Sequence, residues 1–465
     1  MTEPSADSTP VRSIDDLELV FHRSHKPRSA WLIGAEAEKF ALDADTLSPL
    51  PYTGERSVLA LFALLEQRHG WLPSLEYGNG PLVALTRGRS SVTLEPGAQV
   101  ELSASPLPDV YAVCREIKGH LLELRSLSDE LNLRWLSLGF QPLASGDQIP
   151  WVPKERYPIM RRYLPTKGSR AHDMMQRTCT VQANFDYDSE EDALRKLRVM
   201  LKLAPVIQAV SANAPFKEGR VSRLLSERAD VWLNMDPERS GLVERVWRAE
   251  SSSSKRPSYR DYVEWALDAG MFLFRHDGKS FHNTGQTFRS FLQDGFEGQR
   301  ATLGDWTNHL GTLFPEVRLK STLEVRTSDA QSEPLSLAMI ALFTGLLYDE
   351  QALAQAEELT RDFEYAAVVR SRNEVPARGL AAHIGAVAIR PLAEQVVEAA
   401  AGGLSRRGRL GPTGKDEAQL LEPLARLVAA GLTPAEVLRK GLSPGDPVSA
   451  EVVLRAEIDS TRRSS

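Results

Sequence analysis

Four short stretches of the chain alternate polar and apolar residues, as a β-strand does when only one of its faces packs on a core. Three of these stretches carry carboxylates on the polar face: residues 31–38, 94–101 and 314–326. The fourth, residues 177–184, is polar but uncharged after its first residue, Arg177. Like charges gathered on one face are unfavourable unless a cation or ligand compensates them. The pattern therefore predicts a functional sheet face.

Because alternate residues of a strand share a face, each stretch predicts a set of neighbouring polar side chains. The four sets are Glu36 and Glu38; Glu95, Gln99 and Glu101; Thr178, Thr180, Gln182 and Asn184; and Arg318, Lys320, Glu324 and Arg326. Mg²⁺ prefers oxygen ligands and is often shared between carboxylates and phosphates. A face that combines several glutamates with arginine and lysine therefore indicates a site for a nucleotide and its Mg²⁺.

Each set also has a purely structural interpretation. An isolated Glu-x-Glu pair is most often two exposed glutamates, although the apolar residues just before Glu36 favour a largely buried strand. The uncharged stretch could be a half-exposed edge strand or a substrate-binding surface, and the sequence leaves both open. The cations near Glu324 could form a surface ion-pair ladder, which contributes little to stability. They could equally bind a triphosphate and neutralise charge on a transferred phosphoryl group.

The hydrophobic periodicity of the remaining chain predicts further elements. Helices are expected at 13–25, 57–70, 108–131 and 190–211, and strands at 30–43, 80–87, 90–102, 134–140, 177–187 and 316–328. Residues 141–175 are predicted to form a long loop, which inside a compact domain is usually functional. Residues 251–257, which begin with four serines, are predicted to be an exposed flexible loop. From about 331 to 461 the chain is predicted to be mostly helical, with breaks at proline and glycine.

The composition is that of an ordinary globular protein. The net charge of −6 over 465 residues argues against nonspecific nucleic-acid binding. Two cysteines, Cys114 and Cys179, form no disulfide framework or metal-binding spacing, and they fit a reducing compartment. No apolar run reaches the roughly 18 residues of a membrane span, and the first twenty residues carry no signal-like apolar core. We therefore expect a cytoplasmic protein with no membrane or nucleic-acid partner.

Common nucleotide and hydrolase motifs are missing from the sequence. There is no Walker A motif, no Gly-x-Gly-x-x-Gly after a predicted strand and no Gly-x-Ser-x-Gly. A nucleotide site on the predicted face would therefore be of another type.

Several segments, taken in order, resemble the plant and proteobacterial type of glutamate–cysteine ligase. They are residues 33–40, 94–103, 156–160, 173–182, 211–217, 314–320, 323–326 and 431–436. The resemblance runs from about residue 15 to 445. It implies an α+β, glutamine-synthetase-like fold, in which a curved and mainly antiparallel sheet forms an active-site funnel with helices packed outside. We accordingly expect a disordered tail at 1–12 and a single catalytic domain at 13–461, whose sheet-bearing part ends near 330.

The resemblance also implies an activity: ATP-dependent ligation of the glutamate γ-carboxylate to the cysteine amine through a γ-glutamyl phosphate, the first step of glutathione biosynthesis. Two or more Mg²⁺ ions would accompany ATP. A monomer or homodimer is implied. Two alternatives stay open, namely a γ-glutamyl ligase of the same fold that uses another amine, and a non-catalytic homologue that acts as a binding subunit.

Residue by residue, the resemblance assigns roles to the polar sets. The metal ligands would be Glu36, Glu38, Glu95, Glu101 and Glu324. Arg326 would stabilise the phosphoryl group in flight, with Glu324 and Lys320 as further catalytic residues, and Arg318, Lys320 and Arg326 would contact the nucleotide. Arg177, Thr178, Thr180, Gln182 and Asn184 would line the substrate floor, and Arg228, Trp232 and Tyr262 the cysteine pocket.

The sequence departs from the family pattern in four places, one of which is the unusual four-serine stretch that starts at Ser251. Only two cysteines are present, so the two regulatory disulfides of the plant enzymes are excluded. Gly270 replaces a usual proline, and residues 327–332 differ from the family's Gly-Ala-Asp-Gly run. None of these positions lies in the acidic strands, so they bear on the amine substrate more than on the chemistry.

Overall fold

The computed structural model describes residues 7–251 and 257–457. Residues 1–6, and most of the serine-rich stretch predicted to be flexible, lie outside the described residues. Residues 7–12, predicted to be part of a disordered tail, run beside residues 301–304. The Val11 amide donates to the Ala301 carbonyl at 3.0 Å, and Pro10 pairs with Thr302.

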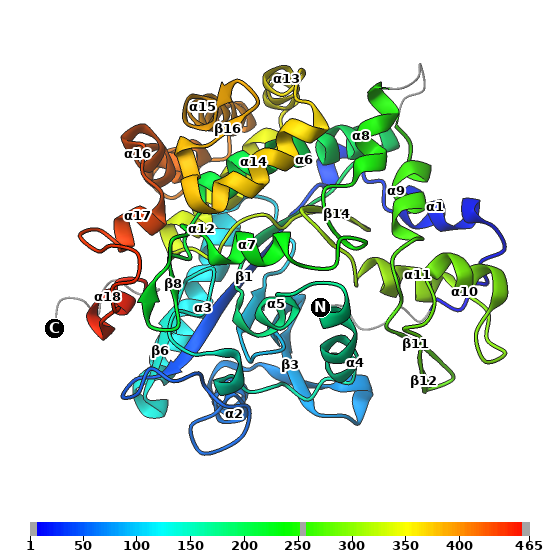
Figure 1. Ribbon diagram of the computed structural model, residues 1–465, viewed down its shortest axis with the longest axis horizontal. Helices are drawn as coiled ribbons and strands as arrows, with labels where there is room; N and C mark the ends of the chain where they lie inside the picture. The colour runs from blue at the N-terminus through cyan, green and yellow to red at the C-terminus, as the bar shows by residue number, and fades with distance from the viewer. Residues whose placement is uncertain (1–6, 252–256, 458–465) are drawn as a thin grey trace.

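A nine-stranded sheet is the centre of the molecule (Figure 1). Its order is β14-β15-β7-β1-β5-β4-β3-β2, with β6 paired to the far end of β1, and every pairing is antiparallel. The strands are β1 Ile33–Asp43, β2 Leu72–Leu75, β3 Leu82–Arg87, β4 Ser90–Leu94, β5 Val100–Ser103, β6 Leu133–Leu136, β7 Val181–Phe185, β14 Val317–Leu319 and β15 Leu323–Val325. The predicted α+β architecture with a mainly antiparallel sheet is confirmed.

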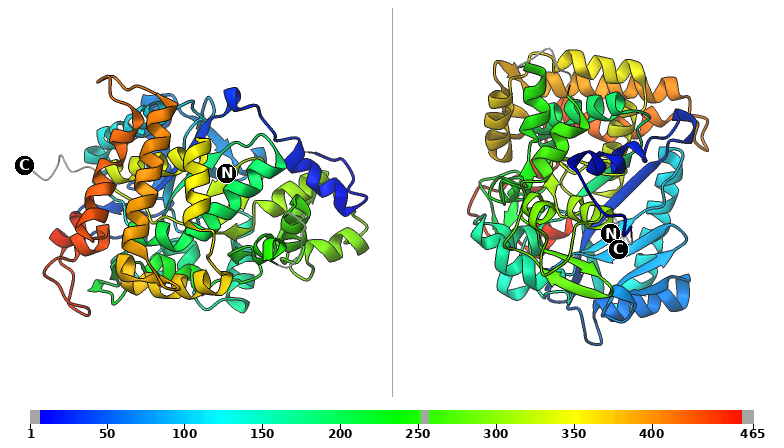
Figure 2. Two further views of the ribbon diagram at one scale, coloured as in Figure 1. Left: turned by 90° about the horizontal axis from the view of Figure 1, so that it is seen from above. Right: turned by 90° about the vertical axis from the view of Figure 1, so that its right-hand side faces the viewer.

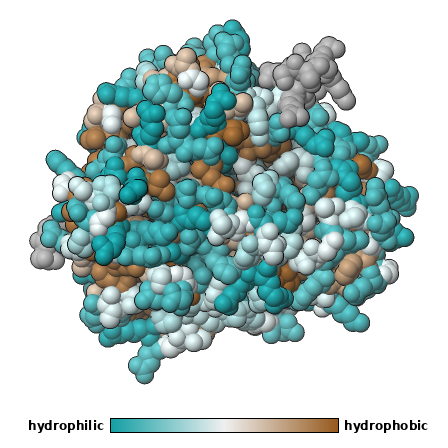
Figure 3. Space-filling view, viewed as in Figure 1, coloured by the Kyte–Doolittle hydropathy of each residue, from teal (hydrophilic) through white to brown (hydrophobic). Residues whose placement is uncertain are grey.

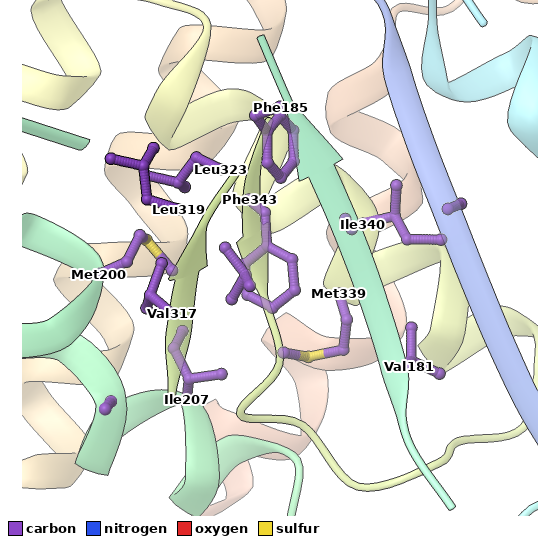
Figure 4. Close-up of a cluster of buried hydrophobic side chains, with 14 of the residues drawn as sticks. Val181, Phe185, Met200, Ile207, Val317, Leu319, Leu323, Met339, Ile340 and Phe343 are labelled. Atoms are coloured by element: carbon purple, nitrogen blue, oxygen red, sulfur yellow. The ribbon is translucent and has the colours of Figure 1, made fainter. Parts of the chain in front are cut away.

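One face of this sheet is apolar and packs on long helices. Val181 and Phe185 of β7 lie against Met339, Ile340 and Phe343, as Figure 4 shows. These three belong to α12, and α6 covers the neighbouring strands β14 and β15. Strand alternation turns Ala35 and Ala37 of β1 toward the same side. The core therefore lies behind the sheet, and the polar residues of the same strands face the other way.

Eighteen helices surround the sheet in the described ranges 7–251 and 257–457. They are α1 Ile14–His22, α2 Val58–His69, α3 Val110–Leu131, α4 Arg156–Tyr163, α5 Ala171–Arg177, α6 Glu190–Val210, α7 Glu227–Leu233, α8 Glu244–Ser251, α9 Tyr259–Ala266, α10 Phe288–Asp294, α11 Leu303–Leu310, α12 Glu333–Leu347, α13 Glu350–Leu359, α14 Tyr365–Arg378, α15 Ile389–Arg407, α16 Glu422–Ala430, α17 Pro434–Leu438 and α18 Ala450–Leu454. In Figure 1 the helices α5 and α7 lie in front of β1.

The C-terminal third is a helical layer on the apolar side, visible along the top of the right-hand view in Figure 2. Helices α12 and α15 cross closely there. A Cβ added to Gly345 would lie 2.2 Å from the Ala400 carbonyl oxygen, so this crossing requires a glycine. The layer matches the predicted helical region, with a short hairpin of β16 His383–Ile384 and β17 Val387–Ala388 inserted.

Four two-stranded ribbons lie outside the main sheet within the described part of the chain. Besides β16–β17 they are β8 Phe216–Lys217 with β9 Arg220–Val221, β10 Ser240–Gly241 with β13 Phe314–Pro315, and β11 Leu273–His276 with β12 Lys279–His282. In Figure 1 the β11–β12 hairpin lies with α1, α9, α10 and α11 at the right of the molecule.

Four expectations from the sequence pattern were wrong. The predicted strand 316–328 is two antiparallel strands, β14 and β15, with residues 320–322 between them. The predicted strand 90–102 is interrupted by a turn at 95–99, because Pro96 and Gly97 break the ladder and Ala98 adopts a φ of 65°. The predicted loop 141–175 contains α4 and the start of α5. The predicted strand 177–187 is shorter, because Arg177 ends helix α5 and the ladder begins at Val181.

The molecular surface in Figure 3 is mostly polar, and hydrophobic residues lie among the polar ones in small groups. In the described ranges no single helix is long and apolar enough to cross a membrane. Helices α12 and α13 meet the length and composition of a span only as a pair, with a 93° bend between them. Because α12 is buried against the sheet, its apolar sequence is explained by the core.

Candidate active site

The polar residues of five strands meet on the face opposite the core. Glu36 lies opposite both Gln182 of β7 and Ser103 of β5, and Glu38 lies opposite Glu101. On the other side of β7, Glu324 lies opposite both Asn184 and Arg318. Directly opposed residues of an antiparallel pair point to the same side of the sheet. The prediction that the acidic, uncharged and cationic sets share one face is therefore confirmed for these residues.

Four of the glutamates, Glu36, Glu38, Glu95 and Glu101, form what we call the acidic centre. Burial, followed by the charges of Glu324 and Glu101, raises the pKa of Glu36 to about 7. Burial, followed by Glu95 and Glu101, raises the pKa of Glu38 well above its ordinary value. These shifts mean that the carboxylates repel one another in a partly dehydrated site, and that a bound cation would relieve the repulsion.

Neighbouring donors hold the acidic centre in place. Asn184 Nδ2 donates to Glu36 Oε1 at 2.9 Å, and the backbone amide of Thr180 donates to Glu38 Oε2 at 2.9 Å. A Cβ on Gly34, which lies opposite Asn184, would come within 3.0 Å of the Asn184 Cβ. A glycine at position 34 therefore gives Asn184 the room from which it reaches Glu36.

Glu101 and Glu95 differ in their surroundings. Glu101 accepts hydrogen bonds from Ser103 Oγ at 2.6 Å and from Thr93 Oγ1 at 3.1 Å. Glu95 belongs to the turn after β4, so it does not extend the strand face as predicted. Burial, followed by the charge of Glu101, raises the pKa of Glu95. Lys154, whose ammonium donates to the Leu94 carbonyl at 2.6 Å, is the charge that opposes this shift most strongly.

Sequence reasoning missed Lys154 and its neighbour Arg156. Lys154 lies just before α4 and Arg156 begins it, inside the segment predicted to be a loop. Both exert an electrostatic effect on Glu95. Burial lowers the pKa of Lys154 to about 8. Two signals were available in the sequence: the segment as a whole was expected to be functional, and residues 156–160, which begin with Arg156, resemble a family motif.

A second group, which we call the cationic corner, consists of Arg318, Lys320 and Arg326 around Glu324. Arg318 forms a two-pronged ion pair with Glu324 at 2.7 to 3.0 Å, and Lys320 Nζ lies 3.2 Å from Glu324 Oε2. Arg326 also pairs with Glu324. Despite burial, these three cations hold the pKa of Glu324 well below its usual range. Three cations share one carboxylate, so the corner keeps a net positive charge.

The two groups are joined through β7. Gln182 Oε1 accepts from Arg326 at 2.5 Å, and Gln182 Nε2 lies 3.4 Å from Glu38 Oε1. Asn184 binds Glu36 with its amide nitrogen, and its oxygen accepts from the Thr322 hydroxyl at 3.1 Å. The amide side chains of β7 therefore lie between the acidic centre and the cationic corner.

The polar atoms of the other residues assigned to the substrate floor bind neighbouring groups of the protein. The Thr178 hydroxyl donates to the Met174 carbonyl at 2.7 Å, and the Thr180 hydroxyl donates to the Ser328 carbonyl at 2.6 Å. Arg177 pairs with Asp173 and Glu218 and stacks on Phe140, with its guanidinium carbon 4.4 Å from the ring centre. A direct role of these three residues in substrate binding stays a prediction.

The residues assigned to the cysteine pocket separate into two places. Arg228 donates to the carbonyls of Arg326 at 2.8 Å and Thr327 at 3.0 Å, and its guanidinium lies 5.8 Å from the Trp232 ring centre. Tyr262 is fully buried, and its hydroxyl accepts from the Leu319 amide at 3.0 Å. Arg228 and Trp232 thus border the cationic corner from α7, and Tyr262 binds the backbone of β14 from α9.

Phe314 is a further residue that the pattern did not single out. Its ring centre lies 6.1 Å from that of Trp232 and 5.9 Å from the Arg326 guanidinium. It begins the last charged stretch of the sequence, which was the available signal. Together with Arg228, these residues form an aromatic and cationic wall beside Glu324.

The donor set fits Mg²⁺ that is shared with a phosphate. Among residues 7–251 and 257–457, no three histidine, cysteine, aspartate or glutamate side chains converge closely enough to hold a metal ion by themselves. Mg²⁺ is usually bound through one or two carboxylates, waters and substrate phosphates rather than by an all-protein cage. The paired Glu38 and Glu101, and Glu36 beside them, supply carboxylates of this kind. The number of ions stays a prediction.

Comparison with known proteins identifies a family. The model of glutamate-cysteine ligase family 2 (GCS2) matches residues 32–453. The chloroplastic glutamate–cysteine ligase B of Oryza sativa subsp. japonica is 38% identical over 440 residues, which cover 94% of this chain and 85% of the relative. The chloroplastic enzyme of Arabidopsis thaliana is 36% identical over 440 residues, which cover 94% of this chain and 81% of the relative.

A solved structure supports the fold. The crystal structure of a glutamate–cysteine ligase from Francisella tularensis in complex with AMP has a TM-score of 0.51 to this chain and 13% sequence identity. The match covers 93% of this chain and 88% of that one. With the antiparallel sheet described above, it shows an α+β, glutamine-synthetase-like fold.

The expectation of a cytoplasmic protein is contradicted. The relatives from rice, Brassica juncea and Arabidopsis are all named chloroplastic, so the cytoplasm is not the location that these relatives indicate. The expectation rested on the cysteine count and on the lack of a signal-like core or membrane-length apolar run, and none of these features distinguishes one reducing compartment from another.

The sequence relatives and the sheet face agree on the kind of enzyme. It is a carboxylate–amine ligase that joins glutamate to cysteine with the use of ATP, the first step of glutathione synthesis. The match to the family model spans nearly the whole described chain, and the acidic and cationic groups lie within it. The chain therefore belongs to glutamate–cysteine ligase family 2.

Proposed function

We propose that the acidic centre and the cationic corner divide the ligase reaction between them. The observation that carries this proposal is the placement of Glu36, Glu38, Glu101 and Glu324 on one sheet face. Three cations surround Glu324, and Gln182 and Asn184 join the two groups. A carboxylate is a poor acceptor for an amine until it is activated. Transfer of the γ-phosphoryl group from ATP to the glutamate γ-carboxylate supplies that activation.

The acidic centre would hold Mg²⁺, with Glu36, Glu38 and Glu101 as the main ligands and Glu95 at the edge. When bound, the metal would neutralise phosphate charge and orient the triphosphate. Glu324 is a further proposed ligand. Its oxygens already form ion pairs with Arg318, Lys320 and Arg326, so it would have to exchange one of these partners.

The cationic corner would stabilise the phosphoryl group. A γ-carboxylate oxygen of glutamate attacks the γ-phosphorus of ATP, the bond to the bridging oxygen breaks, and ADP leaves. Negative charge on the transferred group then faces Arg326 and Lys320, and Arg318 holds Glu324 in place beneath them. In the second step the cysteine amine attacks the acyl carbon, phosphate leaves, and the amine loses a proton.

Substrate recognition would involve the β7 amides and the wall beside the corner. Gln182 and Asn184 carry uncharged donors and acceptors at the junction of the two groups, where a glutamate substrate would lie. Arg228 keeps further guanidinium N–H groups besides the two that donate to carbonyls. Its guanidinium would hold the carboxylate of the amine substrate, with Trp232 beside it.

The test is phosphate release by the purified protein with ATP, Mg²⁺ and glutamate, comparing cysteine with a panel of other amines. Selective turnover with cysteine, together with γ-glutamylcysteine in the product, is expected. Selective turnover with another amine would keep the mechanism and replace the proposed substrate. No turnover with any amine by the folded protein would refute the proposal and favour a non-catalytic homologue. Glu38→Gln should lose turnover, and Glu394→Gln in a surface ion pair is the matched control.

A further inference from the structure

Asp329 is a buried carboxylate that the proposed mechanism does not use. Its Oδ2 accepts from the backbone amide of Asn213 at 2.8 Å, and its Oδ1 accepts from the Ser226 hydroxyl at 3.0 Å. The guanidinium of Arg228 lies 3.7 Å from Oδ1. Both side chains are almost completely buried, with 3% and 4% exposed for Asp329 and Arg228. The pair therefore lies in the interior, without direct access to a substrate through Asp329.

The Asp329 carboxylate fits its space only because residue 139 is a glycine. A Cβ on Gly139 would lie 2.5 Å from Asp329 Cγ, so the backbone of residue 139 passes directly against the side chain. The Gly139 amide in turn donates to the Asn213 carbonyl at 3.0 Å. Asp329 is thus fixed by three separate parts of the chain: the segment after β6, the end of α6 and the cap of α7.

Arg228 connects this carboxylate to the cationic corner. Its Nη1, the nitrogen that lies 3.7 Å from Asp329 Oδ1, donates to the Thr327 carbonyl at 3.0 Å, and its Nη2 donates to the Arg326 carbonyl at 2.8 Å. Arg326 is the residue proposed to stabilise the transferred phosphoryl group. Its own guanidinium is held by Glu324 and Gln182. The backbone of Arg326 is therefore tied to Arg228, while its side chain faces the site.

We propose that Asp329 and Arg228 form a positioning pair that sets the backbone of Arg326 and so aims its guanidinium at the phosphoryl group. This inference rests on the proposed role of Arg326. Asp329 is a positioning residue here, because it acts through Arg228 and touches no substrate. A small displacement of a group that must meet a transition state can cost about a hundredfold in rate.

The chain contains a matched control for a purely structural role. Asp236 and Arg239 form another fully buried ion pair, at 2.7 Å. Arg239 likewise donates to two carbonyls, those of Thr312 at 3.2 Å and Gly270 at 2.7 Å. None of these atoms belongs to the acidic centre or the cationic corner. Asp236→Asn therefore perturbs the same kind of interaction in a different place.

The experiment is a double-mutant cycle on turnover. Asp329→Asn and Asp236→Asn are each made in the native background and in an Arg326→Lys background, and kcat and the KM values for ATP, glutamate and cysteine are measured. Asp329→Asn should lower kcat by about ten- to a hundredfold in the native background and by less than about threefold in the Arg326→Lys background. Asp236→Asn should have the same small effect on kcat in both backgrounds.

Equal effects of Asp329→Asn in both backgrounds would overturn the positioning role, since the residue would then not act through Arg326. An unchanged kcat for folded Asp329→Asn would do the same. Should Asp329→Asn fail to fold, Ser226→Ala removes one hydrogen bond from the carboxylate and is carried through the same cycle. If the native enzyme turns over and Arg326→Lys does not lower kcat, the proposed role of Arg326 fails instead, and the two failures are distinguished.

Discussion

Replacing Glu36 with glutamine should stabilise the metal-free protein while it removes activity. Burial and the charges of Glu324 and Glu101 raise the pKa of Glu36 from its ordinary 4.5 to about 7. This difference corresponds to roughly 3 kcal/mol of folding free energy that is lost when the carboxylate ionises. Glutamine keeps the shape and an oxygen that can accept from Asn184, so the gain should be roughly 1–3 kcal/mol at pH 8, where the native side chain is charged.

The sign of the pH dependence follows from the raised pKa. The folded state binds the Glu36 proton more tightly than the unfolded state, so this contribution favours folding below pH 4.5 and is lost as the pH rises through about 7. Metal-free Glu36→Gln should therefore gain more over the native protein at pH 8 than at pH 5. Mg²⁺ should raise the stability of the native protein by binding the folded state, and should do so much less for the variant.

The assay is urea unfolding at pH 8 and pH 5, with a chelator or with Mg²⁺, alongside a phosphate-release measurement. Glu394→Gln, in an exposed ion pair with Arg390 at 3.3 Å, should change the unfolding free energy by less than about 0.5 kcal/mol at either pH. The reasoning is refuted if metal-free Glu36→Gln is less stable than the native protein at pH 8. It is also refuted if Mg²⁺ stabilises both proteins equally or if the variant keeps native turnover.

Three other substitutions test separate parts of the structure. Burial lowers the pKa of His309 to about 3. The neutral side chain therefore contributes its full stability above pH 6.5, and this contribution is lost as the pH falls toward 3. His309→Gln should make the urea midpoint depend less on pH between pH 6.5 and 4. Gly34→Ala would place a Cβ 3.0 Å from Asn184 Cβ, and kcat should fall about tenfold with less than about 1 kcal/mol of lost stability. Gly345→Ala would meet the Ala400 carbonyl oxygen at 2.2 Å and should cost about 1–3 kcal/mol in urea unfolding with unchanged KM values.

The polar face was predictable because strand alternation is a local property. Glu36 and Glu38 are two residues apart on β1, so their common face follows from the period of a strand alone. The same rule failed for Glu95, because Pro96 and Gly97 end the ladder between Glu95 and Glu101. The alternation of polar and apolar residues continues through this turn, so the pattern alone does not show where the strand ends.

The contacts between strands were not predictable from the pattern. Nothing in the sequence states that Glu38 lies opposite Glu101 or that Glu324 lies opposite Asn184, since register depends on the turns and on packing across the sheet. Lys154 was missed for a related reason. It lies in a segment without strand or helix periodicity, and its ammonium reaches the Leu94 carbonyl only after the chain has folded over β4.

The two faces of the sheet have opposite effects on stability, and this division has a functional consequence. The face toward α12 buries Val181, Phe185 and their neighbours, which favours folding. The other face gathers carboxylates such as Glu36 and Glu38, whose raised pKa values show that their ionisation opposes folding. Packing behind the sheet therefore stabilises a site that is unfavourable on its own. A bound cation would release the repulsion already present in the folded protein, so part of the affinity for metal and nucleotide is set by the core on the opposite face.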